Sequence, residues 1–160
     1  MKCPFCGEEI DYVMMYAEGY RRGSIIATEE VPGRPYIADL ESPEMDDNDA
    51  EIECPECYKY VNCFVAESLQ DRDKVVSEEE APAIVKALAL IEERVEAQER
   101  DVLDGNDGTF VQAKCFSTDK DMVYVKVEFG VLGGVRQVEY TTWWTIDRKM
   151  LEIKENKTSE

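Results

Sequence analysis

Two short cysteine pairs, Cys3-Pro4-Phe5-Cys6 and Cys54-Pro55-Glu56-Cys57, constrain this chain more than any other feature of its sequence. Each pair, here called the first and the second hook, has the spacing that lets one backbone turn aim two thiolates at a single metal ion. Together the hooks predict a tetrahedral zinc site whose four ligands are Cys3, Cys6, Cys54 and Cys57. Such a site is closed, so it would stabilise the fold without performing chemistry.

The hooks resemble the knuckles of the zinc-ribbon family. In the first hook a proline follows the first cysteine and Gly7 follows the second, which is similar to the family's tight turns, where backbone amides donate to the thiolates. The second hook departs from this pattern because Tyr58 replaces the glycine. The resemblance covers residues 1–66 and implies a structural zinc module. Zinc ribbons serve many functions, so it implies structure more firmly than function.

The four cysteines also resemble those of rubredoxin, in which they hold a redox-active iron. Rubredoxins are shorter proteins whose knuckles are closer together, and both of their knuckles carry the small residue. We therefore take zinc as the first hypothesis and an iron electron carrier as an alternative. Metal content would separate the two.

The two cysteines outside the hooks are predicted to be buried thiols. Cys63 alternates with Val61 and Val65, and Cys115 lies in a second apolar run. Either would be able to replace a hook ligand, and the sequence leaves this open. Hooks of this spacing without a signal segment favour metal-bound thiolates over disulfides.

The net charge is −18, from 36 acidic and 18 basic side chains. A zinc ion bound by four thiolates would add two more negative charges. Because binding to DNA or RNA needs Lys and Arg to displace counterions, we expect no direct contact with nucleic acid. The charge is uneven: it is −10 over residues 1–66, −6 over 67–101 and −2 over 102–160.

Neither a membrane protein nor an enzyme is expected. Met1 leads straight into the first hook without a signal segment, and no stretch approaches the roughly 20 apolar residues of a spanning helix. This pattern favours a cytoplasmic protein. The chain has no histidine, which removes the commonest general base near neutral pH and every Cys-His or Ser-His nucleophile system. No spacing among the carboxylates singles out a catalytic pair.

The predicted fold class is α+β, with a zinc-ribbon-like β module over residues 1–66, a helix-and-sheet part over 67–154 and a flexible tail over 155–160. Ser77 and Glu80 have the spacing of a capping box, which predicts a long helix over 78–103. It should pack on an antiparallel four-stranded meander. Period-two patterns and turn residues predict the strands, namely 10–17, 24–28 and 59–66 in the module and 109–117, 121–130, 134–146 and 149–154 in the meander.

Two hypotheses on function follow. In the first, the chain is a zinc-stabilised protein-interaction or regulatory module, and an exposed Trp143 contacts the partner unless a loop or the module covers it. In the second, the acidic surface imitates nucleic acid and inhibits a basic nucleic-acid-handling protein, although acidity also simply keeps proteins soluble. The long helix would also suit homo-oligomerisation. The densest acidic stretch is predicted to be a solvated loop inserted before the second hook, and its candidate partner-binding residues are Glu44, Asp46, Asp47 and Asp49.

Overall fold

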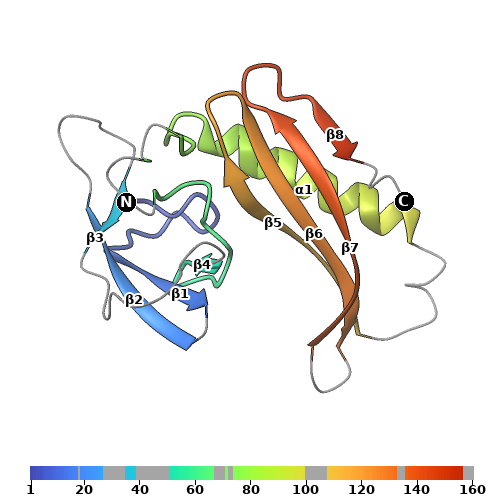
Figure 1. The fold of residues 1–160 in the computed structure, drawn as a ribbon, viewed down its shortest axis with the longest axis horizontal. Coiled ribbons are helices and arrows are strands. Elements are labelled where there is room, and N and C mark those ends of the chain that lie inside the picture. The colour runs from blue at the N-terminus through green and yellow to red at the C-terminus, as the bar shows by residue number, and fades with distance from the viewer. Residues whose placement is uncertain are drawn as a thin grey trace. The chain divides into compact units, whose positions relative to one another are not determined.

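The computed structural model has the mixed α+β composition that the sequence predicts (Figure 1). It divides into two units, Met1–Pro82 with Thr118–Lys120 and Ala83–Ser117 with Asp121–Glu160. Each unit is built on one four-stranded sheet. The structure describes residues 1–17, 19–26, 35–38, 51–66, 71, 74–99, 108–132 and 136–156.

The first unit contains a sheet with the strand order β3-β2-β1-β4. Every pairing in it is antiparallel. On β1, Val13 and Met15 are buried while Tyr12 and Met14 are half-buried, which is the period-two pattern of a strand with one face on the core. The strands are β1 (Tyr12–Ala17), β2 (Gly19–Ile26), β3 (Tyr36–Ala38) and β4 (Glu51–Glu53).

The predicted strand over residues 59–66 is wrong. Tyr60 makes only an isolated bridge to Glu53, and a turn follows in which the Phe64 N–H donates to the Val61 carbonyl over 2.8 Å. Side chains in this segment are buried at odd and even positions alike. The alternating apolar residues in its sequence therefore do not indicate a strand with one exposed face. Its buried residues are Tyr60, Val61, Cys63, Phe64, Val65 and Ala66.

Helix α1 spans Ala81–Gln98. The predicted capping box is present just before it, because the Ser77 N–H donates to the Glu80 carboxylate over 2.9 Å and the Glu80 N–H donates to the Ser77 hydroxyl over 3.4 Å. The helix is shorter than the predicted 78–103. Residues before Ala81 form the capping turn, and residues 100–103 lie outside the described residues.

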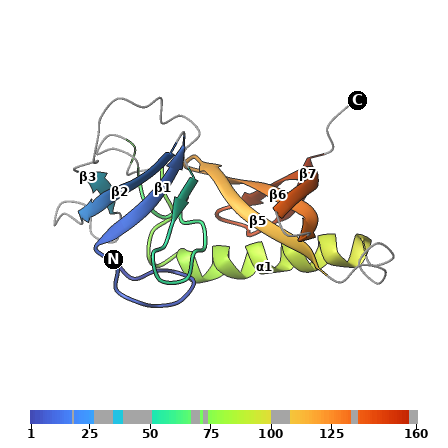
Figure 2. The same cartoon turned by 90° about the horizontal axis from the view of Figure 1, so that it is seen from below.

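The second unit contains the predicted meander, a sheet with the sequential order β5-β6-β7-β8. Strand β6 pairs antiparallel with β7 and β7 with β8, and the short connection from β5 to β6 permits only an antiparallel neighbour. Figures 1 and 2 both show α1 lying along one face of this sheet. The strands are β5 (Thr109–Thr118), β6 (Met122–Leu132), β7 (Arg136–Asp147) and β8 (Ile153–Asn156).

A core lies between α1 and the sheet. Each of its side chains is at most 4% exposed. The helix contributes positions three or four residues apart and the strands contribute alternate positions, so both predicted periodicities are confirmed. The core residues are Ile84, Ala87, Leu88, Ile91 and Val95 from α1, Val123, Val125, Val127 and Phe129 from β6, and Trp144 and Ile146 from β7.

A bulge in β7 corrects one predicted core position. Phe129 pairs with Tyr140, but the next residue, Gly130, pairs with Val138, which makes Glu139 an extra residue on β7. The alternation of side chains therefore changes phase at Glu139. Strict alternation with the buried Trp144 and Ile146 would place Val138 in the core, but Val138 is 43% exposed.

Candidate metal centre

The four hook cysteines come together at one point of the first unit. Their sulfur atoms all lie within 4.8 Å of one another, and the Sγ atoms of Cys3 and Cys57 are 3.8 Å apart. A tetrahedron with metal–sulfur bonds of about 2.3 Å has edges of about 3.8 Å. Four sulfurs at this spacing therefore fit a tetrahedral metal ion such as zinc.

Strand pairing explains why hooks so distant in sequence meet. The first hook lies just before β1 and the second directly follows β4. These strands are antiparallel, with Met14 opposite Glu53, so the start of β1 and the end of β4 are at the same end of the sheet. The two hooks emerge from this end.

The hooks have the same backbone hydrogen bonds. In the first, the Gly7 N–H donates to the Cys3 carbonyl over 2.9 Å, and the Cys3 N–H donates to the Glu8 carbonyl over 2.8 Å. In the second, the Tyr58 N–H donates to the Cys54 carbonyl over 2.9 Å, and the Cys54 N–H donates to the Lys59 carbonyl over 3.0 Å. Each hook closes with an isolated antiparallel bridge, Lys2 to Glu9 in the first and Glu53 to Tyr60 in the second.

Backbone N–H groups point at the sulfurs, as the zinc-ribbon resemblance implies. The Glu56 N–H donates to Cys54 Sγ over 3.4 Å, and the Glu8 N–H lowers the pKa of the Cys6 thiol. Burial raises the pKa of Cys3 and of Cys57, and backbone N–H groups oppose the rise at both residues. Such donors stabilise thiolates, the form in which cysteine binds metal.

The site is buried on one side and open on the other. Cys3 is 1% exposed and Cys54 is fully buried, whereas Cys6 is exposed and Cys57 is half-buried. Two of the cysteines are thus held in the core of the unit, and the other two are partly or fully accessible to solvent. Metal ions and chelators would reach the site from the side of Cys6.

Sequence reasoning missed one positioning residue, Asn62. Its side-chain carbonyl accepts a hydrogen bond from the Ile52 N–H over 3.0 Å, and the Ile52 carbonyl accepts one from the Val61 N–H over 2.7 Å. Together these bonds tie the segment after the second hook to β4. The one available signal was a polar residue inside an apolar run.

Cys63 and Cys115 are not part of the cluster. Both are buried as predicted, at 0% and 2% exposure. The structure assigns them a disulfide-bonded state, which corrects the expectation of free thiols. Neither therefore replaces a hook ligand.

Trp143, the predicted partner contact, is half-buried. It pairs with Lys126 on the sheet face opposite to that of Trp144, and its ring contacts Phe116 edge to face at 5.1 Å. Phe116 itself is 46% exposed. The other proposed contact residues, Glu44, Asp46, Asp47 and Asp49, lie outside the described residues.

No protein family, curated protein or solved structure matches this chain. The resemblance of the hooks to zinc ribbons therefore remains a likeness of two short motifs and their local geometry. Among the described residues, no helix has the length and apolar character that a membrane crossing requires.

Proposed function

We propose that this chain is a non-catalytic, zinc-stabilised module that binds another protein. The observation that carries the zinc assignment is the convergence of four cysteine sulfurs, delivered by two equivalent hooks, within 4.8 Å of one another. Cys3, Cys6, Cys54 and Cys57 would all be ligands. A four-sulfur zinc ion has no open position for water or substrate, so its contribution is to folding.

Protein binding is proposed from charge and from the absence of histidine. A net charge of −18 opposes nucleic-acid backbones and favours basic proteins, to which it would add long-range attraction. The lack of histidine argues against the common forms of acid–base and nucleophilic catalysis. The partner we propose is therefore a basic protein, with nucleic-acid-handling proteins as one such class.

Elemental analysis of protein purified without added metal tests the zinc assignment. We expect one zinc per chain and no visible absorption. Titration with a chelator should then release the zinc with loss of structure in the first unit. Circular dichroism measures this loss. Protein that folds fully with no metal would contradict the assignment.

Iron is a second candidate because of the backbone at Tyr58. The sequence argues against a rubredoxin-like site because Tyr58 replaces a small residue, but its φ of 57° gives it the conformation that a glycine would adopt there. The same four sulfurs would accept iron. If the protein contains one iron per chain and has a red colour that is lost on reduction, the chain is an electron carrier rather than a zinc-stabilised module.

A further inference from the structure

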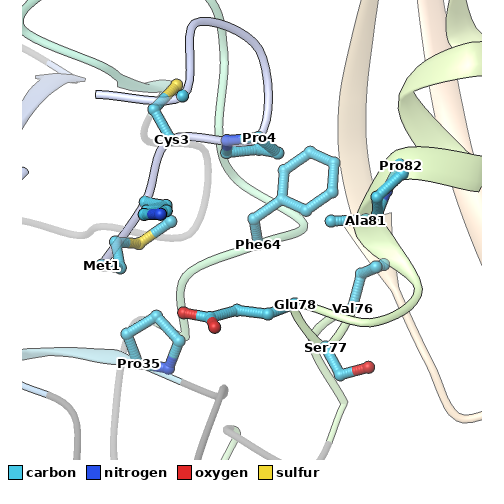
Figure 3. A pocket seen from close by; sticks show the side chains of 12 residues that line it. Met1, Cys3, Pro4, Pro35, Phe64, Val76, Ser77, Glu78, Ala81 and Pro82 are labelled. Atoms are coloured by element: carbon cyan, nitrogen blue, oxygen red, sulfur yellow. The ribbon is translucent and has the colours of Figure 1, made fainter. Parts of the chain in front are cut away.

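A cavity of about 250 Å³ lies in the first unit, next to the first hook. Cys3 of the first hook lines part of it (Figure 3), and so does Gly7, which follows the hook. Its charged side chains are those of Lys2 and Glu78, and Met1 adds the N-terminal ammonium. The apolar wall is formed mainly by Pro4, Pro35, Phe64, Val76, Ala81 and Pro82.

The size and wall of the cavity suit one long side chain. Pockets for drug-sized ligands and cofactors have volumes of roughly 300–1,000 Å³, so about 250 Å³ is small for them. Three of the wall residues are prolines, Pro4, Pro35 and Pro82, and their rigid rings keep the wall in place without further loss of entropy on binding. Pre-formed pockets of this kind receive the anchor residues of protein interfaces.

Glu78 supplies a negative charge at the cavity. Figure 3 shows its side chain extending from the turn before α1 toward Pro35. Within the part of the chain that the structure describes, this carboxylate has no hydrogen-bond or ion-pair partner. Glu80, two residues on, is instead engaged by Ser77 in the capping box. Glu78 is therefore available to a ligand.

The metal centre decides the sign of the local potential. The Met1 ammonium lies 3.8 Å from the Glu9 carboxylate, and the charges of Lys2 and Glu78 oppose one another. A zinc ion bound by four thiolates carries a net charge of −2, and its ligand Cys3 lines the cavity. A cation is thus favoured there once the metal is bound.

We propose that this cavity receives an arginine side chain from a basic segment of the partner protein. The aliphatic stem would lie on the apolar wall beside Phe64, and the guanidinium would pair with Glu78. Arginine fits better than lysine because its planar head pairs with carboxylates through two hydrogen bonds, stacks on aromatic rings and is less strongly hydrated. This inference rests on the proposed function and adds to it the residue that the module recognises.

Binding should depend on metal. The first hook forms one side of the cavity, and the metal ion would fix this hook relative to the second. Removing the metal frees the wall and removes a charge of −2 centred on the thiolates. The zinc-bound chain is therefore the form that binds.

The test uses the full chain loaded with zinc and three blocked glycine pentapeptides whose central residue is arginine, lysine or citrulline. Binding is followed by NMR shifts of the methyl groups of Val76 and Ala81. We expect the arginine peptide to bind with a Kd of about 1 mM. The lysine peptide should bind about threefold more weakly and the neutral citrulline peptide about tenfold more weakly.

Glu78→Gln should weaken binding of the arginine peptide by about tenfold. Glu79→Gln is the matched control, because Glu79 is exposed in the same turn but does not line the cavity, and it should change the Kd by less than about twofold. Ala81→Leu, which fills the cavity, should abolish the Val76 shift.

Equal weakening by Glu78→Gln and Glu79→Gln would overturn the proposal, as would shifts confined to other parts of the chain or no binding below about 10 mM. These results would leave the zinc assignment intact if the same sample contains one zinc per chain. A sample that folds without zinc would instead contradict the proposed function. Chelation of the zinc is expected to abolish peptide binding, and unchanged binding after chelation would refute the proposed coupling to the metal.

Discussion

Tyr58 and Gly7 occupy equivalent places in the two hooks and share a left-handed backbone conformation, with φ values of 57° and 78°. Each follows the second cysteine of its hook, and each donates its N–H to the carbonyl of the first. A glycine adopts this conformation freely, whereas a tyrosine is strained in it. The second hook therefore forms against the local preference of its own sequence.

Replacing Tyr58 by glycine should relieve this strain. We expect Tyr58→Gly to stabilise the zinc-bound first unit by about 1 kcal/mol, and the β-branched variant Tyr58→Val to destabilise it. Tyr58 is 65% exposed, so little packing is lost in either case. Urea denaturation at saturating zinc measures the free energy of unfolding. An unchanged or lower stability of Tyr58→Gly would mean that the tyrosine makes a compensating contact.

Gly7→Ala is the reciprocal experiment. No atom lies within 4 Å of a Cβ placed at Gly7, so the substitution adds backbone strain without a clash. We expect the free energy of unfolding, measured by urea denaturation, to fall by about 1–2 kcal/mol while one zinc stays bound. A neutral effect would show that the first hook relaxes to another conformation.

Serine at any hook cysteine should remove the metal. Cys3→Ser and Cys57→Ser are expected to lose zinc and to loosen the first unit, while much of the second unit remains folded. Both tryptophans, Trp143 and Trp144, belong to the second unit, so their fluorescence reports on it separately. Cys63→Ala is the comparison: it removes a disulfide-bonded cysteine, yet it should keep one zinc, since Cys63 lies outside the cluster. A Cys3→Ser protein with unchanged zinc content would refute the ligand assignment.

The capping box should contribute measurably to helix stability. Ser77→Ala removes the hydroxyl that accepts the Glu80 N–H, and we expect a loss of about 1 kcal/mol in the free energy of unfolding. Glu80→Ala should have a similar effect, and the double variant should lose less than the sum of the two because the residues bond to one another. Glu79→Ala, in the same turn, serves as the control. Strict additivity would contradict the reciprocal bonding.

Glu128 should make the second unit sensitive to acid. Burial raises the pKa of this carboxyl, but Lys114 and Lys126, each 3.0 Å away, outweigh the burial and hold the pKa below its ordinary value of 4.5. Because the folded pKa is the lower one, the stabilisation is present above pH 4.5 and is lost as the pH falls through the folded value.

Glu128→Gln should therefore cost about 2 kcal/mol in the free energy of unfolding at neutral pH, and the cost should shrink as the pH falls below 4.5. Urea denaturation at several pH values, with tryptophan fluorescence as the readout, measures this cost. The control is Glu96→Gln on the exposed side of α1. A cost that does not change with pH would assign the effect to packing rather than to charge.

Features that depend on neighbours in sequence could be predicted. The two cysteine hooks follow from the Cys-x-x-Cys spacing, which a single turn satisfies, and the start of α1 follows from side chains that bond within one turn. The meander follows from the alternation of apolar and polar side chains along strands that have only one face covered by the helix. For each hook, for the helix start and for each strand, the signal lies within a few residues of the structure that it produces. The meeting of the two hooks is different, because it depends on the pairing of β1 with β4.

Other features depend on segments that are remote in sequence. Residues 60–66 are all buried except the half-buried Asn62, which removes the alternation of buried and exposed side chains on which strand prediction relies. Pairing with β6 places the bulge at Glu139, and no local preference at that residue marks it.

The sequence by itself therefore determined which four cysteines form the two hooks, because each hook is a local turn. Only the tertiary structure decided that Tyr58 adopts a glycine-like conformation, because pairing of β1 with β4 brings the second hook to its place. It alone also formed the cavity of Phe64 and Glu78, whose wall comes from chain segments far apart in sequence.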